Sequence, residues 1–335
     1  MKFGFVSLIG RPNAGKSTLL NRLVGSKLAI VSDKPQTTRT RILGVKNYPD
    51  AQVVFLDTPG IHRPLHRMNV RMVDTAVDTI GDVDVLGVVI DASERQGKGD
   101  AFVLNLVKKA KIPVVLILNK IDLMKKSRLL PIIAEYARQA EFAEIVPVSA
   151  ATGDNVERLE RLLIDRLPEG APMYPDDYLT DQPERFLAAE IVREKLLQFT
   201  HAELPFSSAV IVDRFDEAAE KRREGLLRLF CTIVVERESQ KPIVVGKGGE
   251  MIKRIGTAAR EELERMFQTR VYLDLHVRVR SEWRENEHVL SEIGLGAEGH
   301  RSSEGRGAAR SWPDEKDAET SPDEVPALDG EPEDV

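Results

Sequence analysis

The chain has 335 residues, of which 42% are hydrophobic and 30% charged, and its formal net charge is −6. This length allows a substantial hydrophobic core and about two domains. No apolar run approaches the roughly 20 residues that cross a bilayer. The apolar stretch at the N-terminus is short and no small-residue cleavage site follows it, so a secretory signal is not expected. The single cysteine, Cys231, excludes an intramolecular disulfide and a multi-cysteine metal cluster, which favours a cytoplasmic protein.

The first half of the chain alternates short apolar runs with amphipathic stretches. The runs are rich in Val, Ile and Leu and predict buried strands, whereas the amphipathic stretches predict helices. This alternation is typical of a parallel sheet whose ligands lie beyond the carboxyl ends of the strands. The predicted strands are residues 3–10, 51–57, 83–91, 113–119 and 144–147, and the predicted helices are residues 16–24, 69–80, 100–109, 128–141 and 156–166.

After this half the organisation of the chain changes. Residues 168–182 contain Pro, Gly and Asp without periodicity and predict a linker between domains 1–167 and 183–296. The second domain has the pattern of an α+β fold. Its predicted helices are residues 183–200, 250–269 and 282–293, and its predicted strands are residues 208–215, 226–238 and 270–280.

The C-terminal segment, residues 297–335, has a different composition from the rest. It holds 12 acidic and 4 basic residues and few large apolar ones. Such a segment cannot bury enough apolar surface to offset the entropy of ordering. We expect a disordered acidic tail outside the fold.

A glycine-rich motif joins the first predicted strand to the first predicted helix. It matches the pattern G-x-x-x-x-G-K-[ST], in which backbone N–H groups and a helix N-terminus cradle phosphates. Lys16 is expected to neutralise the β- and γ-phosphates, and the Ser17 hydroxyl to ligate Mg²⁺. The residues expected to bind nucleotide here are Gly10, Arg11, Pro12, Asn13, Ala14, Gly15, Lys16, Ser17 and Thr18.

Three further motifs follow later strands. The first, at 57–60, places a carboxylate near the metal, acting through water, and a glycine N–H near the γ-phosphate. The second, at 119–122, offers Asp122 to the N1–H and amino donors of guanine, a pair that adenine lacks. The third, at 149–151, can supply a backbone N–H to the base oxygen. Four such motifs in order predict binding of GTP and GDP. The residues concerned are Asp57, Thr58, Pro59, Gly60, Asn119, Lys120, Asp122, Ser149 and Ala150.

These motifs resemble those of the Ras-like, translation-factor-related GTPases. The resemblance implies that a threonine in the stretch 34–39 ligates Mg²⁺ in the GTP state. Thr38 is the expected ligand and Thr37 the alternative. It also implies catalysis by Lys16, Thr38 and Gly60 through charge stabilisation and water positioning, without a side-chain base.

One position departs from many members of this group. Ile61 follows Gly60, where many such GTPases have a glutamine, and isoleucine cannot hydrogen-bond a water. The nearby His62 and His66 are better explained as loop residues than as a base. In related proteins with a Pro-Asn pair, as at 12–13, the asparagine is associated with K⁺. The resemblance therefore implies a K⁺ ion near Asn13 and slow intrinsic hydrolysis.

The second domain contains a short glycine-rich loop before a predicted helix. The loop resembles the GxxG loop of a KH domain, which clamps about four single-stranded nucleotides. A tight turn without function remains the alternative for this motif alone. Residues 181–296 carry 19 basic and 21 acidic side chains, so RNA recognition must be local. The expected RNA-binding residues are Gly246, Lys247, Gly248, Gly249, Lys253 and Arg254.

The predicted fold is an α/β P-loop GTPase domain, with a mostly parallel sheet and helices on both faces, followed by an α+β KH domain of type II and a disordered acidic tail. This arrangement resembles the Era family of bacterial GTPases over residues 1–296. The stretches that carry the resemblance are KPQTTRTR at 34–41, RFLAAEIVREK at 185–195, ELP at 203–205 and VVGKGG at 244–249.

The resemblance implies a monomeric, GTP-hydrolysing switch that binds the 3′ end of 16S ribosomal RNA. It further implies docking to the 30S precursor, with roles in 16S rRNA processing and 30S biogenesis. It allows a peripheral contact with the inner face of the cell membrane. The tail at 297–335 is not part of the family pattern, and is either a solvated terminus or an acidic competitor for the RNA groove.

Two other functions remain open on the sequence. The chain could be a GTPase that serves RNA modification or another assembly step, although such proteins usually lack the KH pattern. It could also be an RNA-binding module that holds GTP only as a structural ligand. The presence of Lys16, Ser17 and Thr38 argues against the second possibility.

Overall fold

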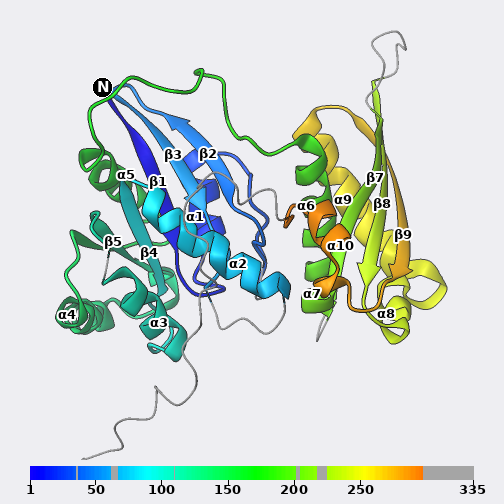
Figure 1. The fold of residues 1–335 in the computed structure, drawn as a ribbon, viewed down its shortest axis with the longest axis horizontal. Helices are drawn as coiled ribbons and strands as arrows, with labels where there is room; N and C mark the ends of the chain where they lie inside the picture. The colour runs from blue at the N-terminus through cyan, green and yellow to red at the C-terminus, as the bar shows by residue number, and fades with distance from the viewer. Residues whose placement is uncertain (35–36, 62–66, 109, 201–203, 217–224, 297–335) are drawn as a thin grey trace, which may run out of the picture. The chain divides into compact units, whose positions relative to one another are not determined.

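The computed structural model describes residues 1–34, 37–61, 67–108, 110–200, 204–216 and 225–296 (Figure 1). The described residues belong to one compact unit that contains two separate β-sheets. The tail predicted at 297–335 and the loop residues His62 and His66 lie outside the described residues. Among the described helices, none is long and apolar enough to cross a membrane.

The first sheet has six strands in the order β2-β3-β1-β4-β5-β6, and all are parallel except β2, which runs antiparallel to β3. The five predicted strands are present with ends that shift by a few residues. The strands are β1 (Lys2–Ile9), β2 (Ile42–Asn47), β3 (Ala51–Asp57), β4 (Val85–Asp91), β5 (Val114–Asn119) and β6 (Glu144–Pro147).

The sequence analysis did not predict β2. Its sequence, ILGVKN, has no clear alternation of apolar and polar residues. The strand forms because a tight turn, with the Tyr48 N–H donating to the Ala51 carbonyl at 2.8 Å, folds it back onto β3. Gly44 is needed in this strand, since a Cβ there would lie 2.7 Å from the Val24 side chain and 2.9 Å from that of Leu28.

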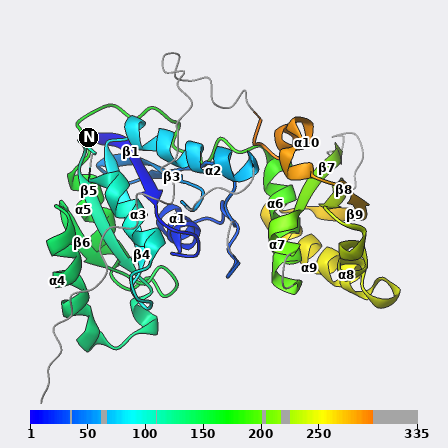
Figure 2. The same cartoon turned by 60° about the horizontal axis from the view of Figure 1, so that its bottom comes forward.

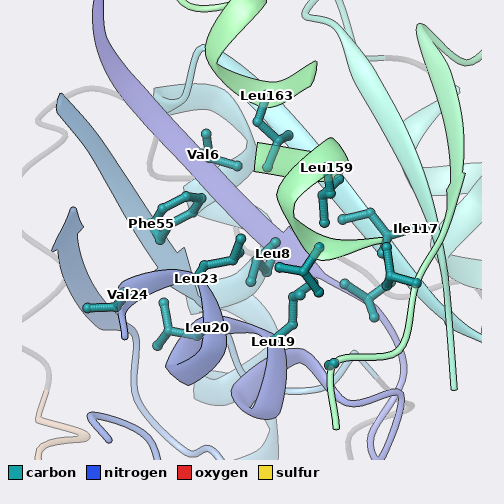
Figure 3. Packing of buried hydrophobic residues seen from close by; sticks show 14 of the residues in the cluster. Val6, Leu8, Leu19, Leu20, Leu23, Val24, Phe55, Ile117, Leu159 and Leu163 are labelled. Carbon is teal, nitrogen blue, oxygen red and sulfur yellow. The ribbon is translucent and has the colours of Figure 1, made fainter. Parts of the chain in front are cut away.

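Helices cover both faces of this sheet. On one face α1 and α5 bury leucines against the strands, among them Leu19, Leu23 and Leu159 around Leu8 (Figure 3). On the other face α2, α3 and α4 pack against the alternate strand residues. Parallel strands buried on both faces explain the continuous apolar runs of the sequence. The helices are α1 (Lys16–Val24), α2 (Arg67–Asp78), α3 (Lys98–Val107), α4 (Leu129–Gln139) and α5 (Val156–Asp165).

The segment predicted as a linker, 168–182, contains no helix and only one isolated bridge residue, but it is bonded to the edge of the first sheet. The Val45 N–H donates to the Leu179 carbonyl at 2.9 Å, and the Thr180 hydroxyl donates to the Leu43 carbonyl at 2.6 Å. The segment therefore runs beside β2 and covers polar groups that an edge strand exposes.

The second sheet has the order β7-β8-β9, with β7 antiparallel and β9 parallel to β8 (Figure 2). Helices α6 and α9 pack on one face through alternate strand residues such as Val210, Cys231 and Ile233. The order helix α6, strands β7 and β8, helix α9 and strand β9 matches the α+β pattern predicted for the second domain. The elements are α6 (Glu184–Phe199), α7 (Leu204–Ser207), β7 (Ser208–Asp216), β8 (Leu226–Val235), α8 (Lys241–Val245), α9 (Glu250–Phe267), β9 (Arg270–Val279) and α10 (Glu287–Glu292).

Three helices of this domain differ from the prediction. The four-residue helix α7 was not predicted. Helix α8 was not predicted, because it is only five residues long and carries Pro242 near its start. The helix predicted at 282–293 is interrupted: a single turn, Trp283–Glu285, precedes α10. The Asn286 side chain accepts the backbone N–H groups of His288 and Val289, and this cap starts a new helix.

The other face of β7 and β8 is partly covered by residues from two regions of the chain. Ala209 and Ile211 pack with Trp283 and with Met68 and Met72 of α2. Both methionines are fully buried. The helix that follows the motif at 57–60 is therefore packed against the second domain.

The core of the first domain gives a direct stability test. Leu8 is fully buried on the central strand, and replacing it with alanine is expected to lower the free energy of unfolding by about 2–5 kcal/mol. Leu130→Ala is the control, since Leu130 is 75% exposed on α4 and its loss should change stability by about 0.5 kcal/mol or less. Urea unfolding followed by circular dichroism measures both. Equal stability losses in the two variants would contradict the packing described.

Candidate functional site

A cavity of about 410 Å³ lies at the carboxyl end of β1, where the predicted phosphate loop leads into α1. Its lining brings together residues that are far apart in the chain, from the phosphate loop, the stretch at 30–38, Gly60 and Lys120. The carboxyl ends of parallel strands meet at one edge of the sheet, which explains this convergence. The predicted residues in the lining are Pro12, Asn13, Gly15, Lys16, Ser17, Thr18, Thr38, Gly60 and Lys120.

The phosphate loop is stabilised by hydrogen bonds from the Lys16 side chain to its backbone. Lys16 is buried, and its ammonium donates to the carbonyls of Gly10 at 3.3 Å and Arg11 at 3.1 Å. Burial lowers the pKa of Lys16, while the charge of Asp57 opposes this shift. Gly10 allows close packing, because a Cβ there would lie 2.3 Å from the Val89 carbonyl oxygen. The Lys16 ammonium therefore supplies a positive charge at the cavity lining.

Three oxygen atoms converge beside the loop. The Ser17 hydroxyl donates to Asp57 Oδ2 at 2.6 Å, the Thr38 hydroxyl donates to the same oxygen at 3.1 Å, and the two hydroxyls lie 2.6 Å apart. Burial raises the pKa of Asp57, opposed by Lys16 and by these hydrogen bonds. Two hydroxyls and a carboxylate are the hard oxygen donors that Mg²⁺ prefers, so these residues fit the predicted metal.

The cluster also distinguishes the two candidate threonines. The Thr37 hydroxyl donates to the Lys34 carbonyl at 2.6 Å and does not join the cluster. Thr38 is only 6% exposed and directs its hydroxyl toward Ser17 and Asp57. The geometry favours Thr38 as the metal ligand.

The motif at 57–60 approaches the phosphate loop closely. A Cβ on Gly60 would lie 2.7 Å from the backbone of Pro12, so only glycine fits there. The Thr58 hydroxyl donates to the Leu8 carbonyl at 2.9 Å, so it stabilises the strand end and does not point into the cavity. Ile61 is fully buried and packs with the core around Ile9. An aliphatic side chain in this core cannot position a water, as its residue type predicts.

Two other residues of the phosphate loop, Arg11 and Asn13, make side-chain contacts with segments outside the loop. Arg11 pairs with Glu94 at 2.5 Å and with Asp100 at 3.3 Å. Asn13 has a left-handed backbone conformation, with φ 63°, and its side-chain amide donates to the Asp33 carbonyl at 2.7 Å. Asn13 therefore connects the phosphate loop to the stretch that leads to Thr38.

The predicted base-recognition residues form a second cluster. Asn119 connects two loops, because its amide nitrogen donates to the Ala14 carbonyl at 2.9 Å and its oxygen accepts the Ala150 N–H at 2.9 Å. Asp122 is exposed and accepts the Ser149 hydroxyl at 2.5 Å, which orients the carboxylate. A guanine oxygen would have to share or replace the bond that the Ala150 N–H makes to Asn119.

Lys120 completes this end of the site. It adopts a left-handed backbone conformation, with φ 65°, and its ammonium lies 2.6 Å from Asp91. Burial of Asp91 opposes ionisation, but its bonds to Lys120 and Ser93 prevail and lower the pKa of Asp91. Lys120 therefore lines the cavity while its ammonium pairs with Asp91 at the end of β4.

The predicted RNA-binding loop joins α8 to α9. Gly246, Gly248 and Gly249 all have positive φ values, and a Cβ on Gly248 or Gly249 would meet no atom within 4 Å. This open, left-handed backbone with the exposed Lys247 is suited to close approach by a phosphodiester chain.

Of the other two predicted RNA-binding residues, Lys253 is exposed near the start of α9. The Arg254 guanidinium lies over the Phe199 ring, 4.2 Å from its centroid. The Arg254 guanidinium therefore already makes a cation–π contact within the second domain.

The cavity includes residues that the sequence analysis did not single out: Ile30, Val31, Ser32, Asp33 and Glu94. The first four lie shortly before Thr38 in the sequence, so their position near a predicted ligand was a usable signal. Glu94 gave no such signal, because only the fold brings it to Arg11.

Comparison with protein-family models supports both domains. A model described as "50S ribosome-binding GTPase" matches residues 5–120, and a KH domain model matches residues 211–284. The chain is similar to GTPase Era of Geotalea uraniireducens, with 53% identity over 291 residues that cover 87% of this chain and 97% of the relative. GTPase Era of Syntrophus aciditrophicus is 49% identical over 293 residues, covering 88% and 95%.

The chain is also similar to solved structures of Era. A crystal structure of Era in complex with MgGDPNP and nucleotides 1506–1542 of 16S ribosomal RNA matches with a TM-score of 0.84 and 42% identity, over 88% of this chain and 99% of that one. A crystal structure of a variant of Aquifex aeolicus Era bound to GDP·AlF4⁻ also matches with a TM-score of 0.84 and 42% identity, over 88% and 100%.

The assignment of the metal ligand can be tested by replacing each threonine. Thr38→Ala removes an oxygen from the cluster and is expected to weaken Mg²⁺ binding with a GTP analogue by about tenfold, while Mg²⁺ binding with GDP stays unchanged. Thr37→Ala is the matched control and should leave both affinities unchanged. Calorimetric titration of Mg²⁺ measures them. A larger loss with Thr37→Ala would identify Thr37 as the ligand.

Proposed function

The chain belongs to the Era family of GTPases, and we propose that it couples its GTPase cycle to binding of the 3′ end of 16S ribosomal RNA during assembly of the 30S subunit. Its activity is the hydrolysis of GTP to GDP and phosphate. The observation that carries the proposal is the cluster of Ser17, Thr38 and Asp57 at the cavity, in the same chain as a KH domain with an open glycine loop.

The arrangement supports hydrolysis by positioning and charge. When bound, Mg²⁺ would neutralise charge on the phosphates, held by Ser17 and Thr38 and, through water, by Asp57. Lys16 supplies a second positive charge at the floor of the cavity. Gly60 brings its backbone against the phosphate loop, where its N–H can contact the γ-phosphate. None of these groups acts as a side-chain base, so we propose slow intrinsic turnover.

Both alternative functions fit these observations less well. A module that holds GTP only as a structural ligand has no need for a threonine hydroxyl in the metal cluster, yet Thr38 is there. A GTPase for RNA modification would not require a KH loop. The proposed location is the cytoplasm, where ribosomal RNA precursors occur.

The proposal includes a K⁺ ion near Asn13. Asn13 lies at the cavity with its amide nitrogen bonded to the Asp33 carbonyl. A cation between these loops would add positive charge where the leaving phosphate becomes negative. With Ile61 in the core, such a charge would compensate in part for the missing glutamine.

Potassium dependence is tested by hydrolysis rates at equal ionic strength. GTP turnover is expected to be at least about tenfold faster in KCl than in NaCl. Asn13→Ala should reduce this difference, because it removes the proposed ligand. Equal rates in the two salts would remove potassium from the mechanism.

RNA binding is proposed at the surface beside the glycine loop. Strand β9 is an edge strand of the second sheet, and its apolar residues Leu275 and Val277 are partly buried. Ile243 on α8 remains 49% exposed next to the loop. An apolar surface beside an open backbone and a lysine fits stacked bases and a phosphate chain.

Charge reversal at the loop tests this site. Lys247→Glu is expected to lower the affinity for a single-stranded RNA with the 3′-terminal 16S sequence by about tenfold, and to make its salt dependence shallower by about 1 in log–log slope. Arg265→Glu is the control, because the exposed Arg265 lies on α9 about 22 Å along the helix axis from the loop. Fluorescence anisotropy measures both. Equal losses would indicate general electrostatic attraction without a loop site.

A further inference from the structure

Two neighbouring residues of α6 hold the stretch that leads to Thr38. Glu194 Oε1 accepts the Val31 N–H at 2.8 Å, near the start of this stretch. The Arg193 guanidinium donates to the carbonyl of Thr37, the residue just before the metal ligand. A single turn of a helix in the second domain therefore contacts both ends of the loop from 31 to 37.

The Arg193 side chain is also held by a second residue of α6, Glu190. The arginine side chain is 2% exposed, and Glu190, one turn earlier on α6, accepts its Nε at 2.7 Å and its Nη2 at 2.6 Å. A guanidinium held at two points by a carboxylate has little freedom to rotate. Its remaining contact with Thr37 is therefore strongly directional.

The Glu194 side chain is held by two charged partners, Lys27 and Lys195. The glutamate side chain is 1% exposed and lies 2.6 Å from the Lys27 ammonium and 2.9 Å from that of Lys195. Both lysines also pair with Glu262 on α9. This partly buried network of two cations and two anions balances its charges and fixes α6 and α9 against Lys27, which lies just before the loop.

The residue after Thr38 is held by the second domain as well. Arg39 Nη1 donates to the Ser208 carbonyl at 2.9 Å, and its guanidinium lies over Trp283, 5.6 Å from the ring centroid. Contacts from the second domain therefore flank Thr38 on both sides in the sequence, although Thr38 itself faces the metal cluster.

We propose that Arg193 is a positioning residue for GTP hydrolysis, which sets the Thr38 hydroxyl by holding the Thr37 carbonyl. The Thr37 carbonyl and the Thr38 N–H and Cα share one rigid peptide plane. Fixing the carbonyl oxygen therefore limits the rotation that would turn the Thr38 side chain away from Ser17 and Asp57. The KH domain completes the metal site in this way, although no residue of the described helix α6 lines the cavity.

The same contacts could serve only to attach α6 to the first domain. The two roles differ in what they predict. An attachment contact changes stability, whereas a positioning contact changes the GTP-bound site selectively. GDP binding does not require Thr38 at the metal, so GDP affinity separates the two roles.

The test is Arg193→Gln in the full chain, assayed without RNA so that it is independent of the proposed RNA function. Single-turnover hydrolysis is expected to slow by about 10- to 100-fold, with kcat reduced more than KM changes and GDP affinity unchanged. Hydrogen exchange at the Thr38 amide should become faster with a GTP analogue bound. Arg193→Lys, which keeps the positive charge and one donor nitrogen but loses the two-point hold by Glu190, should recover part of the rate.

Arg185→Gln is the matched control. Arg185 lies on the same helix and also donates to backbone carbonyls, those of Val212 at 2.9 Å and Asp213 at 3.0 Å, within the second domain. The Arg185→Gln variant should leave the hydrolysis rate and hydrogen exchange at the Thr38 amide unchanged. If Arg193→Gln does not fold, Glu190→Gln releases the anchor of Arg193 and is judged by the same measurements.

Two results would overturn the proposal. One is hydrolysis by the Arg193→Gln variant, or by Glu190→Gln in its place, at the rate of the unchanged protein. The other is an equal loss in Arg185→Gln, which would show that any disturbance of α6 slows the reaction.

Discussion

The oxygen cluster of Ser17, Thr38 and Asp57 is the contact on which the rest of the structure depends. Each residue comes from a different part of the chain: the start of α1, the stretch before β2 and the end of β3. Burial makes the Asp57 carboxylate costly to hold in charged form, so it requires Lys16 and the two hydroxyls around it. Because the three elements meet only at this edge of the sheet, the cluster can form only when the first domain has folded correctly.

The second domain contacts both segments that surround this cluster. Arg193 and Glu194 of α6 hold the stretch before Thr38, while Trp283 packs with Met68 and Met72 of the helix after Gly60. A displacement of either segment would therefore break or rearrange these contacts with the KH domain. Glu262 extends this link to α9, the helix that begins at the glycine loop. The two sites are thus connected by a continuous set of described contacts.

Much of this could be predicted from the sequence because the motifs carry their own chemistry and lie at strand ends. The predicted loop from Gly10 to Ser17 and the α+β pattern of the second domain match the structure for that reason. Strand β2 and helix α8 could not be predicted, since short elements form through pairing and packing that local sequence does not specify. The choice between Thr37 and Thr38 depends on which hydroxyl reaches Ser17 and Asp57 in the folded chain, and the proposed role of Arg193 depends on a contact between residues 156 positions apart. Spacing alone does not encode such contacts.

The segment beside β2 has a further consequence for the behaviour of the protein in solution. An uncovered edge strand offers its free N–H and carbonyl groups to a strand of another molecule, which is a common route to aggregation. Here the hydrogen bonds from Val45 to Leu179 and from Thr180 to Leu43 occupy that edge with the chain's own connection between domains. The same stretch of polypeptide thus joins the two domains and shields this edge of the sheet from intermolecular pairing.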